Sequence, residues 1–424
     1  MLRGGRVVDA TGERGGDVLV EGDRIVEVGD GLRGDRELDA GGCVVAPGLV
    51  DLHVHLREPG MEEAETIETG ARAAALGGFT AVVAMPNTTP PHDDPAVVGA
   101  VLAKGARASC EVHAAGAITK GREGTELAPM GELHALGVRI FTDDGACVDA
   151  AGVMRAALEY AASLPDAVVA QHAEDSTLAA GGHMHEGEWS SRLGIPGRPA
   201  AAEDTIVARD CILAALTGTR VHFLHLSSAG AIEQVRAAKA RGLPVTAEAA
   251  PHHFTLTDES CASFDPAFKV HPPLRGPADV AAVKAGLADG TIDAIATDHA
   301  PHPTEAKERP FEEAPPGMLG LETALALTLE ELVEPGVLDL PTALARLSWG
   351  PAAIAGLVDH GAPIAAGSTA NLCVFDPDAR WTVVPDALAS RARNTPYAGR
   401  ELRGRVRHTI LRGEPVVLDG CATR

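Results

Sequence analysis

The chain has 424 residues, of which 45% are hydrophobic and 22% charged, and its formal net charge at pH 7 is −23. This length allows one large buried core plus an accessory domain, while the acidic balance argues against nucleic acid or an anionic membrane as a partner. The seven cysteines are dispersed, and neither a signal-peptide pattern nor a membrane-length apolar run is present, which predicts a cytoplasmic protein.

The first and last parts of the chain have the short alternating runs that are typical of β-strands. Strands are predicted at 6–9, 17–21 and 24–28, and again at 371–375, 381–384, 406–411 and 415–418. We expect residues 1–46 and 358–424 to fold together into one small β-sandwich domain.

Between these segments, apolar runs of strand length alternate with Ala-rich amphipathic stretches, which is the pattern of βαβ units. Eight such runs occur, the strand number of a (β/α)8 barrel, at 43–55, 79–87, 110–118, 137–144, 167–172, 220–227, 244–253 and 292–299. Helices are predicted at 62–76, 150–163, 203–216, 229–241 and 277–288. The predicted fold class is therefore α/β, a TIM-like (β/α)8 barrel over residues 47–357 with the small β domain outside it.

Polar side chains gather at the C-terminal ends of these runs, which is where barrels of this kind build their active sites. The residues in question are His53, His55, Asn87, Asp143, Asp144, His172, His225, His252, His253 and Asp298. Structural histidines have no reason to prefer strand ends, so the repeated placement predicts one shared site.

The pair His53 and His55 carries the strongest metal signal, because an i, i+2 spacing on a strand points both imidazoles to one face. With Asp298 they form a ligand set suited to zinc or a similar divalent ion. The alternative is a pair of strand histidines that line a polar crevice. Taken alone, His172 and His225 would more often be hydrogen-bonded core residues, but next to such a pair we interpret them as ligands.

These ligands exceed the needs of one tetrahedral zinc and suit two ions, one held by His53, His55 and Asp298 and the other by His172 and His225. Either Asp143 or Asp144 could supply a bridging carboxylate, but adjacent strand residues face opposite sides, so only one can reach the site. The pair His252 and His253 could orient a ligand by a hydrogen bond. Three other histidines, His113, His134 and His222, are interpreted as structural.

Residues 51–60, Asp-Leu-His-Val-His-Leu-Arg-Glu-Pro-Gly, and 296–302, Ala-Thr-Asp-His-Ala-Pro-His, followed by Lys307, resemble the two signatures of dihydroorotases. Stretches at 65–70, 74–80, 272–275 and 317–323 extend the resemblance over essentially the whole chain. It is closest to the longer bacterial class (class I) of the amidohydrolase superfamily. Residues 141–145, Phe-Thr-Asp-Asp-Gly, lack the carbamylated lysine of many superfamily relatives, which favours a dihydroorotase over a hydantoinase or allantoinase.

The resemblance implies the reversible cyclisation of N-carbamoyl-L-aspartate to L-dihydroorotate plus water, in pyrimidine synthesis. It implies one or two zinc ions per subunit, and we expect two. Asp298 would be both a ligand and the general acid/base. By the family pattern Asp144 is the bridging residue, with Asp143 as the fallback.

The resemblance also implies the substrate contacts. Arg57, Asn87 and His302 would hold the substrate carboxylate, which a guanidinium can bind bidentately. The alternative for Arg57 is an ordinary ion pair with Glu58 or Glu63. The other implied contacts are His55, His271, Pro316 and Gly317, where His271 replaces the usual asparagine and Pro316 replaces an aromatic residue found in many relatives.

The sequence alone leaves two other functions open. One is a cyclic amidase for another substrate, such as a hydantoin. The other is a non-catalytic dihydroorotase-like subunit that supports aspartate transcarbamoylase, although inactive relatives of that kind lose metal ligands and this chain keeps them. We also expect a homodimer, and a complex with aspartate transcarbamoylase is compatible with an active enzyme.

Overall fold

The computed structural model describes all 424 residues. Its centre is a closed barrel of eight parallel strands, assembled from a β6-β7-β8 sheet and a β9-β10-β13-β14-β15 sheet. Parallel bridges from Val54 to His299 and from Gly116 to Phe141 join the two sheets. Each strand lies within one predicted apolar run: β6 (Leu49–Val54), β7 (Phe79–Ala84), β8 (Glu111–Ala114), β9 (Ile140–Phe141), β10 (Val168–Gln171), β13 (Val221–Phe223), β14 (Val245–Ala249) and β15 (Ala294–Ile295). The predicted barrel is confirmed.

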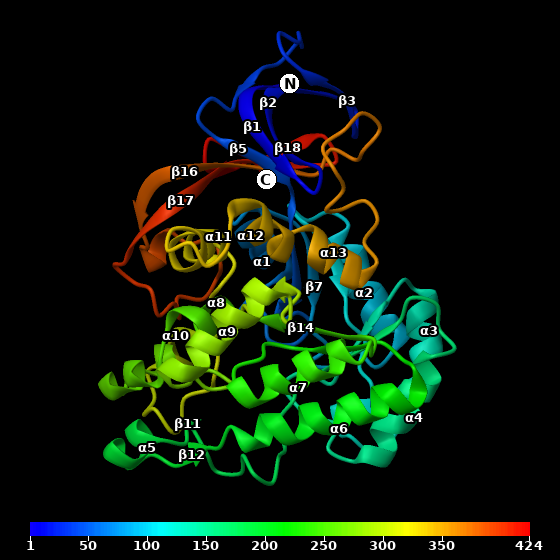
Figure 1. The fold of residues 1–424 in the computed structure, drawn as a ribbon, viewed down its shortest axis with the longest axis vertical. Helices are drawn as coiled ribbons and strands as arrows, with labels where there is room; N and C mark the ends of the chain where they lie inside the picture. Colours follow the sequence, from blue (N-terminus) through cyan, green and yellow to red (C-terminus); the bar gives the residue numbers. More distant parts are fainter.

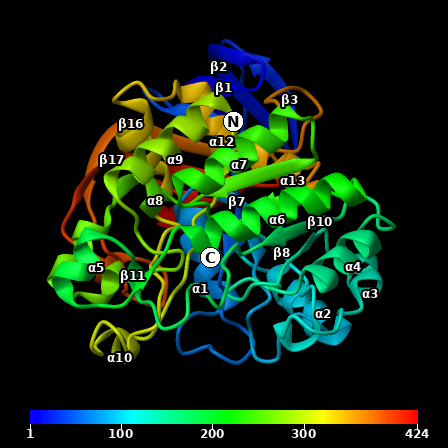
Figure 2. The same cartoon turned by 60° about the horizontal axis from the view of Figure 1, so that its bottom comes forward.

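Helices cover the outside of the barrel, and Figure 2 shows α6 and α7 crossing its surface. Nine of the α-helices are α1 (Ile67–Leu76), α2 (Pro95–Gly105), α3 (Met130–Ala135), α4 (Ala151–Ala161), α6 (Ala201–Thr217), α7 (Ala229–Ala240), α9 (Pro277–Asp289), α12 (Leu340–Leu347) and α13 (Trp349–Ala355). The others are α5 (Glu188–Leu193), α8 (Pro251–Thr255), α10 (Thr304–Lys307) and α11 (Ala324–Thr328). None of the helices has both the length and the apolar content needed to cross a membrane.

Local sequence explains where these helices begin and end. Helix α9 starts with Pro277 at its first position and ends at Gly290, whose φ of 84° is left-handed. Helix α1 was predicted from residue 62 but begins at Ile67, because Thr66 caps it by accepting a hydrogen bond from the Thr69 amide. Residues 62–66 are therefore a loop, and this leaves Glu65 free to contact other elements.

The barrel separates two apolar layers. The outer layer, between strands and helices, is a cluster of 64 buried residues. The inner layer is a cluster of 14 residues that includes Val50 and Leu52 from β6 and Ile354 from α13. Helix α13 therefore closes the end of the barrel where the strands begin, and the opposite end is left for polar side chains.

Strands from both ends of the chain form a second sheet, which Figure 1 shows at one end of the molecule beside the barrel. It has nine strands in the order β19-β18-β17-β16-β5-β1-β2-β3, with β4 paired to β1. The strands are β1 (Leu2–Asp9), β2 (Gly12–Glu21), β3 (Arg24–Gly29), β4 (Leu38–Asp39), β5 (Val44–Pro47), β16 (Leu372–Thr382), β17 (Glu401–Leu411), β18 (Glu414–Leu418) and β19 (Cys421–Ala422). The predicted β domain from both ends of the chain is confirmed, and its strands pair as one continuous sheet.

Strand β5 joins the two halves of this sheet, because it pairs in parallel with β1 and antiparallel with β16. It ends at Pro47, and β6 of the barrel begins at Leu49. The chain therefore passes from the terminal sheet into the first barrel strand within two residues, which fixes the direction of β6 and of the polar residues at its far end.

Candidate active site

The C-terminal ends of five barrel strands bring four histidines and two aspartates together. His53 lies on β6 and His55 directly after it, and the others follow β9, β10, β13 and β15 in turn. All six side chains are buried, with exposed fractions of 5% or less: His53, His55, Asp144, His172, His225 and Asp298. The structure thus brings together every residue that the sequence predicted as a metal ligand.

Asp144 lies at the centre of this cluster. Its Oδ2 atom is 3.3 Å from His53 Nε2 and 3.6 Å from His55 Nε2. Its Oδ1 atom is 3.5 Å from His172 Nδ1 and 3.6 Å from His225 Nε2. Each oxygen of one carboxylate therefore faces a different pair of imidazoles, the arrangement expected of a carboxylate between two cations.

Asp143, the alternative to Asp144, points away from the cluster. Its carboxylate accepts hydrogen bonds from the backbone amides of Ile118 (2.8 Å) and Thr119 (3.0 Å), and from the Thr119 hydroxyl. The two adjacent side chains point in different directions from the turn that follows β9. Asp143 holds the loop that follows β8, and Asp144 alone reaches the histidines.

Asp298 completes the first group of predicted ligands. Its Oδ1 atom is 3.1 Å from His55 Nε2 and 3.5 Å from His53 Nε2. Burial opposes ionisation, but the hydrogen bond from His55 and the charge of His53 outweigh it and hold the pKa of Asp298 well below its usual range. Asp298 is therefore an anion at neutral pH.

The cluster has the properties of a divalent-metal site. His53 Nε2 and Asp144 Oδ1 are buried without any hydrogen-bond partner, which is costly for polar atoms inside a protein. Imidazole nitrogen and carboxylate oxygen are donors that Zn²⁺ and similar ions accept. Two sets of atoms lie within ligating reach of one another: His53, His55 and Asp298, and His53, Asp144 and His225. The donor set fits one or two ions.

Glu248 on β14 supports this cluster and was missed by the sequence analysis. Its Oε1 atom is 2.9 Å from His53 Nδ1, and its Oε2 atom is 3.0 Å from His222 Nε2. Burial disfavours the charged carboxylate, but the hydrogen bonds from His222 and His53 lower the pKa of Glu248 to about 2. A carboxylate that accepts the Nδ1 proton leaves Nε2 of His53 free to bind a metal.

Three residues of the site have backbone conformations that side chains other than glycine rarely adopt. The φ angles are 60° at Arg57, 32° at His225 and 48° at Asp298. Each of these conformations costs free energy that the surrounding fold must supply. The strain lies at the strand ends that aim functional groups into the barrel mouth.

A cavity of about 330 Å³ opens directly above the cluster. Its size falls at the lower end of the range for small-molecule sites. Its lining includes all the predicted substrate contacts, together with five residues that the sequence did not single out: Gly145, Glu174, Arg198, Val270 and Ala300. Arg198 on β12 (Gly197–Arg198) pairs with Glu174 and so has its charge neutralised inside the protein.

Arg57 presents an unpaired positive charge to this cavity. Its Nε atom donates to the Pro301 carbonyl (3.1 Å), and its Nη2 atom lies 3.4 Å from His302 Nε2. It makes no ion pair with Glu58 or Glu63, since Glu58 binds Lys104 instead. Burial lowers the pKa of Arg57 to about 10, so the guanidinium stays charged at neutral pH. A buried cation without an anionic partner is suited to an anionic ligand.

The loop on the other side of the cavity is tied down by hydrogen bonds. His302 Nε2 donates to the Pro316 carbonyl (2.8 Å), and Gly317 donates its amide to the Lys269 carbonyl (2.8 Å). Gly317 has a φ of 135°, and a Cβ there would come within 2.7 Å of Ala300 Cβ. The backbone amide of Gly317 and the carbonyl of Pro316 are therefore engaged within the protein.

The remaining predicted contacts also line the cavity. Asn87 Oδ1 lies 2.8 Å from His55 Nδ1, so Asn87 orients the His55 ring as well as facing the cavity. His271 is half-buried, and its Nε2 atom is buried without a hydrogen-bond partner. By contrast, His252 and His253 do not line the cavity, and His253 Nε2 donates to the Pro272 carbonyl (3.0 Å).

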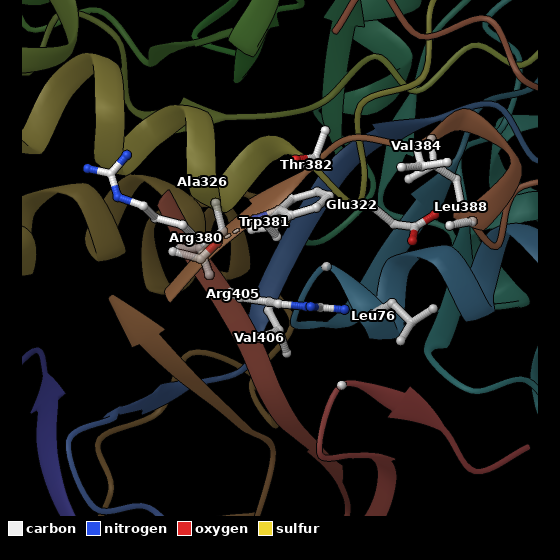
Figure 3. Close-up of a pocket in the computed structure, with 15 residues that line it drawn as sticks. Leu76, Glu322, Ala326, Arg380, Trp381, Thr382, Val384, Leu388, Arg405 and Val406 are labelled. Atoms are coloured by element: carbon white, nitrogen blue, oxygen red, sulfur yellow. Dashed lines mark hydrogen bonds between the residues drawn. The ribbon is translucent and has the colours of Figure 1, made fainter. Parts of the chain in front are cut away.

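A second cavity, of about 290 Å³, lies where β16 and β17 meet the barrel (Figure 3). Trp381, Arg405 and Glu322 line it, and Figure 3 shows the Arg405 side chain extended toward Leu76. None of its 15 lining residues is a histidine or cysteine, and Glu322 is the single acid among them. Its lining therefore lacks the cluster of His, Cys, Asp or Glu donors that a metal site needs.

Known proteins resemble this chain over its full length. Residues 42–231 match the Dihydro-orotase-like family. A dihydroorotase of Streptomyces coelicolor is 50% identical over 428 aligned residues, which cover 100% of this chain and 99% of the relative. A dihydroorotase of Mycobacterium tuberculosis is 48% identical, and the alignment covers 95% of each chain.

Solved structures share the fold at lower sequence identity. The L-hydantoinase (dihydropyrimidinase) of Arthrobacter aurescens superposes with a TM-score of 0.90 at 25% identity, covering 100% of this chain and 97% of the other. The dihydropyrimidinase of Brevibacillus agri gives 0.85 at 23% identity, covering 100% and 95%. These structures confirm the architecture of a barrel with a terminal β domain.

Proposed function

Because the chain belongs to the dihydroorotase family, we propose that its barrel mouth catalyses the reaction of that family with the residues described above. The reaction is the reversible cyclisation of N-carbamoyl-L-aspartate to L-dihydroorotate plus water, a step of pyrimidine synthesis. In the hydrolytic direction water adds to a ring carbonyl, and the bond between that carbon and the ring nitrogen breaks. The site must therefore hold an anionic ring compound, activate water and move one proton.

Two zinc ions would be held by the six clustered side chains. His53, His55 and Asp298 would bind one ion, His172 and His225 the other, and Asp144 would lie between them. The chemistry that bound divalent ions supply at such a site is Lewis acidity, which lowers the pKa of water and polarises a carbonyl group. Support for this assignment comes from the unpartnered His53 Nε2 and Asp144 Oδ1 atoms.

Arg57 would bind the carboxylate of the substrate, with Asn87 and His302 beside it. Burial and the nearby charge of Arg57 lower the pKa of His302 to about 3, so its imidazole is neutral. The Asn87 amide can donate a hydrogen bond to the carboxylate, and Arg57 supplies the positive charge. Neutral His302 would lie beside the carboxylate, with its one N–H donated to the Pro316 carbonyl. This binding would hold the ring with its reacting carbonyl over Asp144 and Asp298.

Asp298 would transfer the proton. As an anion it can accept a proton from the attacking water and then deliver it to the ring nitrogen as the C–N bond breaks. In the cyclising direction the same carboxylate would remove a proton from the ureido nitrogen and return it to the departing water. Its contact with His55 Nε2 at 3.1 Å keeps the carboxylate at the base of the cavity.

The observation that carries the proposal is the unpaired guanidinium of Arg57 above a cluster of metal-binding side chains. A hydantoin or dihydropyrimidine ring without an acid group would leave this buried charge without a partner, which is unfavourable. A substrate with a ring carboxylate satisfies it.

The test is dihydroorotate hydrolysis at alkaline pH, followed by ultraviolet absorbance, with added zinc and with a chelator. We expect zinc-dependent turnover, and we expect Asp298→Ala to lower kcat by about 10²–10⁴-fold while metal content is largely retained. Turnover of a hydantoin in place of dihydroorotate would favour a related cyclic amidase. If the protein neither hydrolyses dihydroorotate nor binds zinc, the result would favour the non-catalytic subunit and refute the proposal.

We further propose that the enzyme is a cytoplasmic homodimer that can associate with aspartate transcarbamoylase. The seven cysteines are all free, which suits a reducing compartment, and the family resemblance supports the assembly. Gel filtration with light scattering would measure the mass of the chain alone and mixed with aspartate transcarbamoylase. A monomeric mass, or two separate peaks in the mixture, would contradict these assignments.

A further inference from the structure

Three metal-binding side chains meet at the end of the barrel opposite the active site. Glu111 is the first residue of β8 and His113 lies two residues on. Val112 and Ala114 pack in the outer core, so Glu111 and His113 point to the other face of the strand, toward the barrel interior. His360 follows α13, the helix that closes this end, and supplies the third side chain.

The three groups lie within reach of a single ion. His113 Nε2 is 3.4 Å from Glu111 Oε1, and His360 Nε2 is 3.3 Å from Glu111 Oε2. The two imidazole rings are perpendicular, with centroids 6.3 Å apart. One donor atom from each residue lies within 4.8 Å of the other two, as in the catalytic cluster.

Both imidazoles present an unsatisfied nitrogen to the carboxylate. The Nε2 atoms of His113 and His360 are buried and make no hydrogen bond. His360 is 5% exposed, so bulk water does not solvate it. Polar atoms inside proteins nearly always have a partner, and two such orphans beside one carboxylate need an explanation.

We propose that Glu111, His113 and His360 form a second divalent-metal site, with Zn²⁺ as the ion whose ligand preferences they match. Two imidazoles and one carboxylate are a common protein ligand set for zinc. This assignment is independent of the catalytic reaction, because none of the three residues contacts the active-site cavity.

Neighbouring residues hold the ligands in place. Arg412 contacts Glu111 Oε2 through Nε (3.1 Å) and Nη2 (3.0 Å), which leaves Oε1 available on the side of His113. His360 Nδ1 lies 3.0 Å from Thr80 Oγ1 and 3.3 Å from Asn371 Nδ2, contacts that orient the ring so that Nε2 faces Glu111. Zinc bound at Nε2 would leave the ring proton on Nδ1, where Thr80 Oγ1 can accept it. Such outer partners are typical of zinc-binding histidines and carboxylates.

The site is also accessible from solvent. A cavity of about 490 Å³ reaches Glu111 and His113 and is lined further by Arg412 and Arg424. It provides an entry path for an ion and room for water as a fourth ligand. Three protein ligands plus water also describe catalytic zinc sites, but this end of such barrels contributes to stability rather than catalysis. The ion would join β8, the segment after α13 and, through Arg412, the terminal sheet.

The experiment compares His113→Gln with His134→Gln as the matched control. His134 bonds the Pro165 carbonyl (2.8 Å) and lies outside both metal clusters. Each full-length variant is dialysed against buffered micromolar zinc, and its zinc content is measured by elemental analysis. We expect His113→Gln to hold one zinc fewer per chain than the wild type, with dihydroorotate hydrolysis unchanged. His134→Gln should match the wild type.

A crystallographic measurement would locate the ion directly. Crystals grown with zinc should give an anomalous peak about 2.0–2.1 Å from His113 Nε2 and His360 Nε2, in addition to peaks in the barrel mouth. Glu111→Gln should remove this peak and leave the others. Equal zinc content in both histidine variants, or no peak beside His360, would overturn the proposal and leave a His–Glu–His cluster that binds no metal.

Discussion

His53 and Glu248, 195 positions apart in the chain, meet with Nδ1 and Oε1 2.9 Å apart. The contact fixes one nitrogen of the imidazole, so the other faces Asp144 and Asp298. Because the same carboxylate also bonds His222, its position is set from two strands. Glu248 would therefore act on the proposed metal site through His53.

We predict that Glu248→Gln weakens zinc binding by about 10–100-fold. A glutamine amide can donate to Nδ1, which would move the imidazole proton to Nε2, the atom that faces the cluster. Competition with a chelator would measure the affinity. Asp210→Asn is the matched control, since Asp210 is a buried carboxylate that pairs with Arg209 instead. Equal affinity of the Glu248 variant and the wild type would remove Glu248 from this role.

Arg57→Lys should impair substrate binding more than turnover. Lysine keeps the charge but loses the planar pair of donors, so we expect KM for dihydroorotate to rise about tenfold, corresponding to about 1.4 kcal/mol. Steady-state kinetics would be compared with those for 5,6-dihydrouracil, which has no carboxylate. A similar rise in KM for both compounds would show that Arg57 does not bind the carboxylate.

Metal binding should strengthen as pH rises. Burial opposes protonation of His53, but Asp144 and Glu248 outweigh it and raise the pKa of His53 well above its ordinary value. The metal-free site therefore carries a proton on His53 at neutral pH, and an ion must displace it. Zinc affinity should increase about tenfold per pH unit while this proton is exchanged.

Titrations at pH 6, 7 and 8 would measure this dependence, together with the protons released on binding. His53→Ala should reduce the slope because the exchanged proton is then absent. A pH-independent affinity for the wild type would mean that zinc does not bind to His53.

Glu322, at the cavity beside the terminal sheet, should make stability fall with pH. Burial raises the pKa of Glu322 from 4.5 to about 7, although the Ala389 amide donates to its carboxylate. Between these values the folded chain holds a proton that the unfolded chain has lost. Unfolding free energy therefore declines from pH 4.5 to 7 and then levels off.

Glu322→Gln should remove this decline, because glutamine does not ionise. We expect its Tm to match the wild type at pH 5 and to exceed it at pH 8, by a free energy on the order of 1 kcal/mol. Glu259→Gln, which changes an exposed carboxylate outside any ion pair, is the control. A Tm difference that is the same at both pH values would contradict the raised pKa.

The barrel was predictable because each strand is a separate apolar run with polar residues at one end. The spacing of His53 and His55 indicated a shared face, and Asp144 was chosen over Asp143 from the family pattern. Glu248 could not be found in this way. It is a single acid inside the apolar run of β14, and no local pattern relates it to a histidine on β6. The only hint in the sequence was that Glu248 places a charged residue within a strand predicted to be buried.

The loops of the site were predicted less well for a similar reason. Arg198 enters the cavity from β12, which pairs only with the short β11 (Met184–His185). Both strands are too short to show the alternation of apolar and polar residues by which a strand is recognised in a sequence. The hydrogen bond from His302 to Pro316 likewise depends on how a 14-residue loop folds back, which tertiary packing decides.

The position of β5 also has a consequence for how the chain is made. Its partner β1 leaves the ribosome just before it, but its other partner, β16, is synthesised only after the whole barrel sequence. The hydrogen bond from Arg14 to the Ile364 carbonyl also cannot form until a residue 350 positions later has been synthesised. During synthesis the edge of β5 is therefore open, and exposed strand edges pair readily with other chains. A nascent chain stalled within the barrel would be prone to aggregation at its N-terminal strands, and chaperone contact should concentrate there.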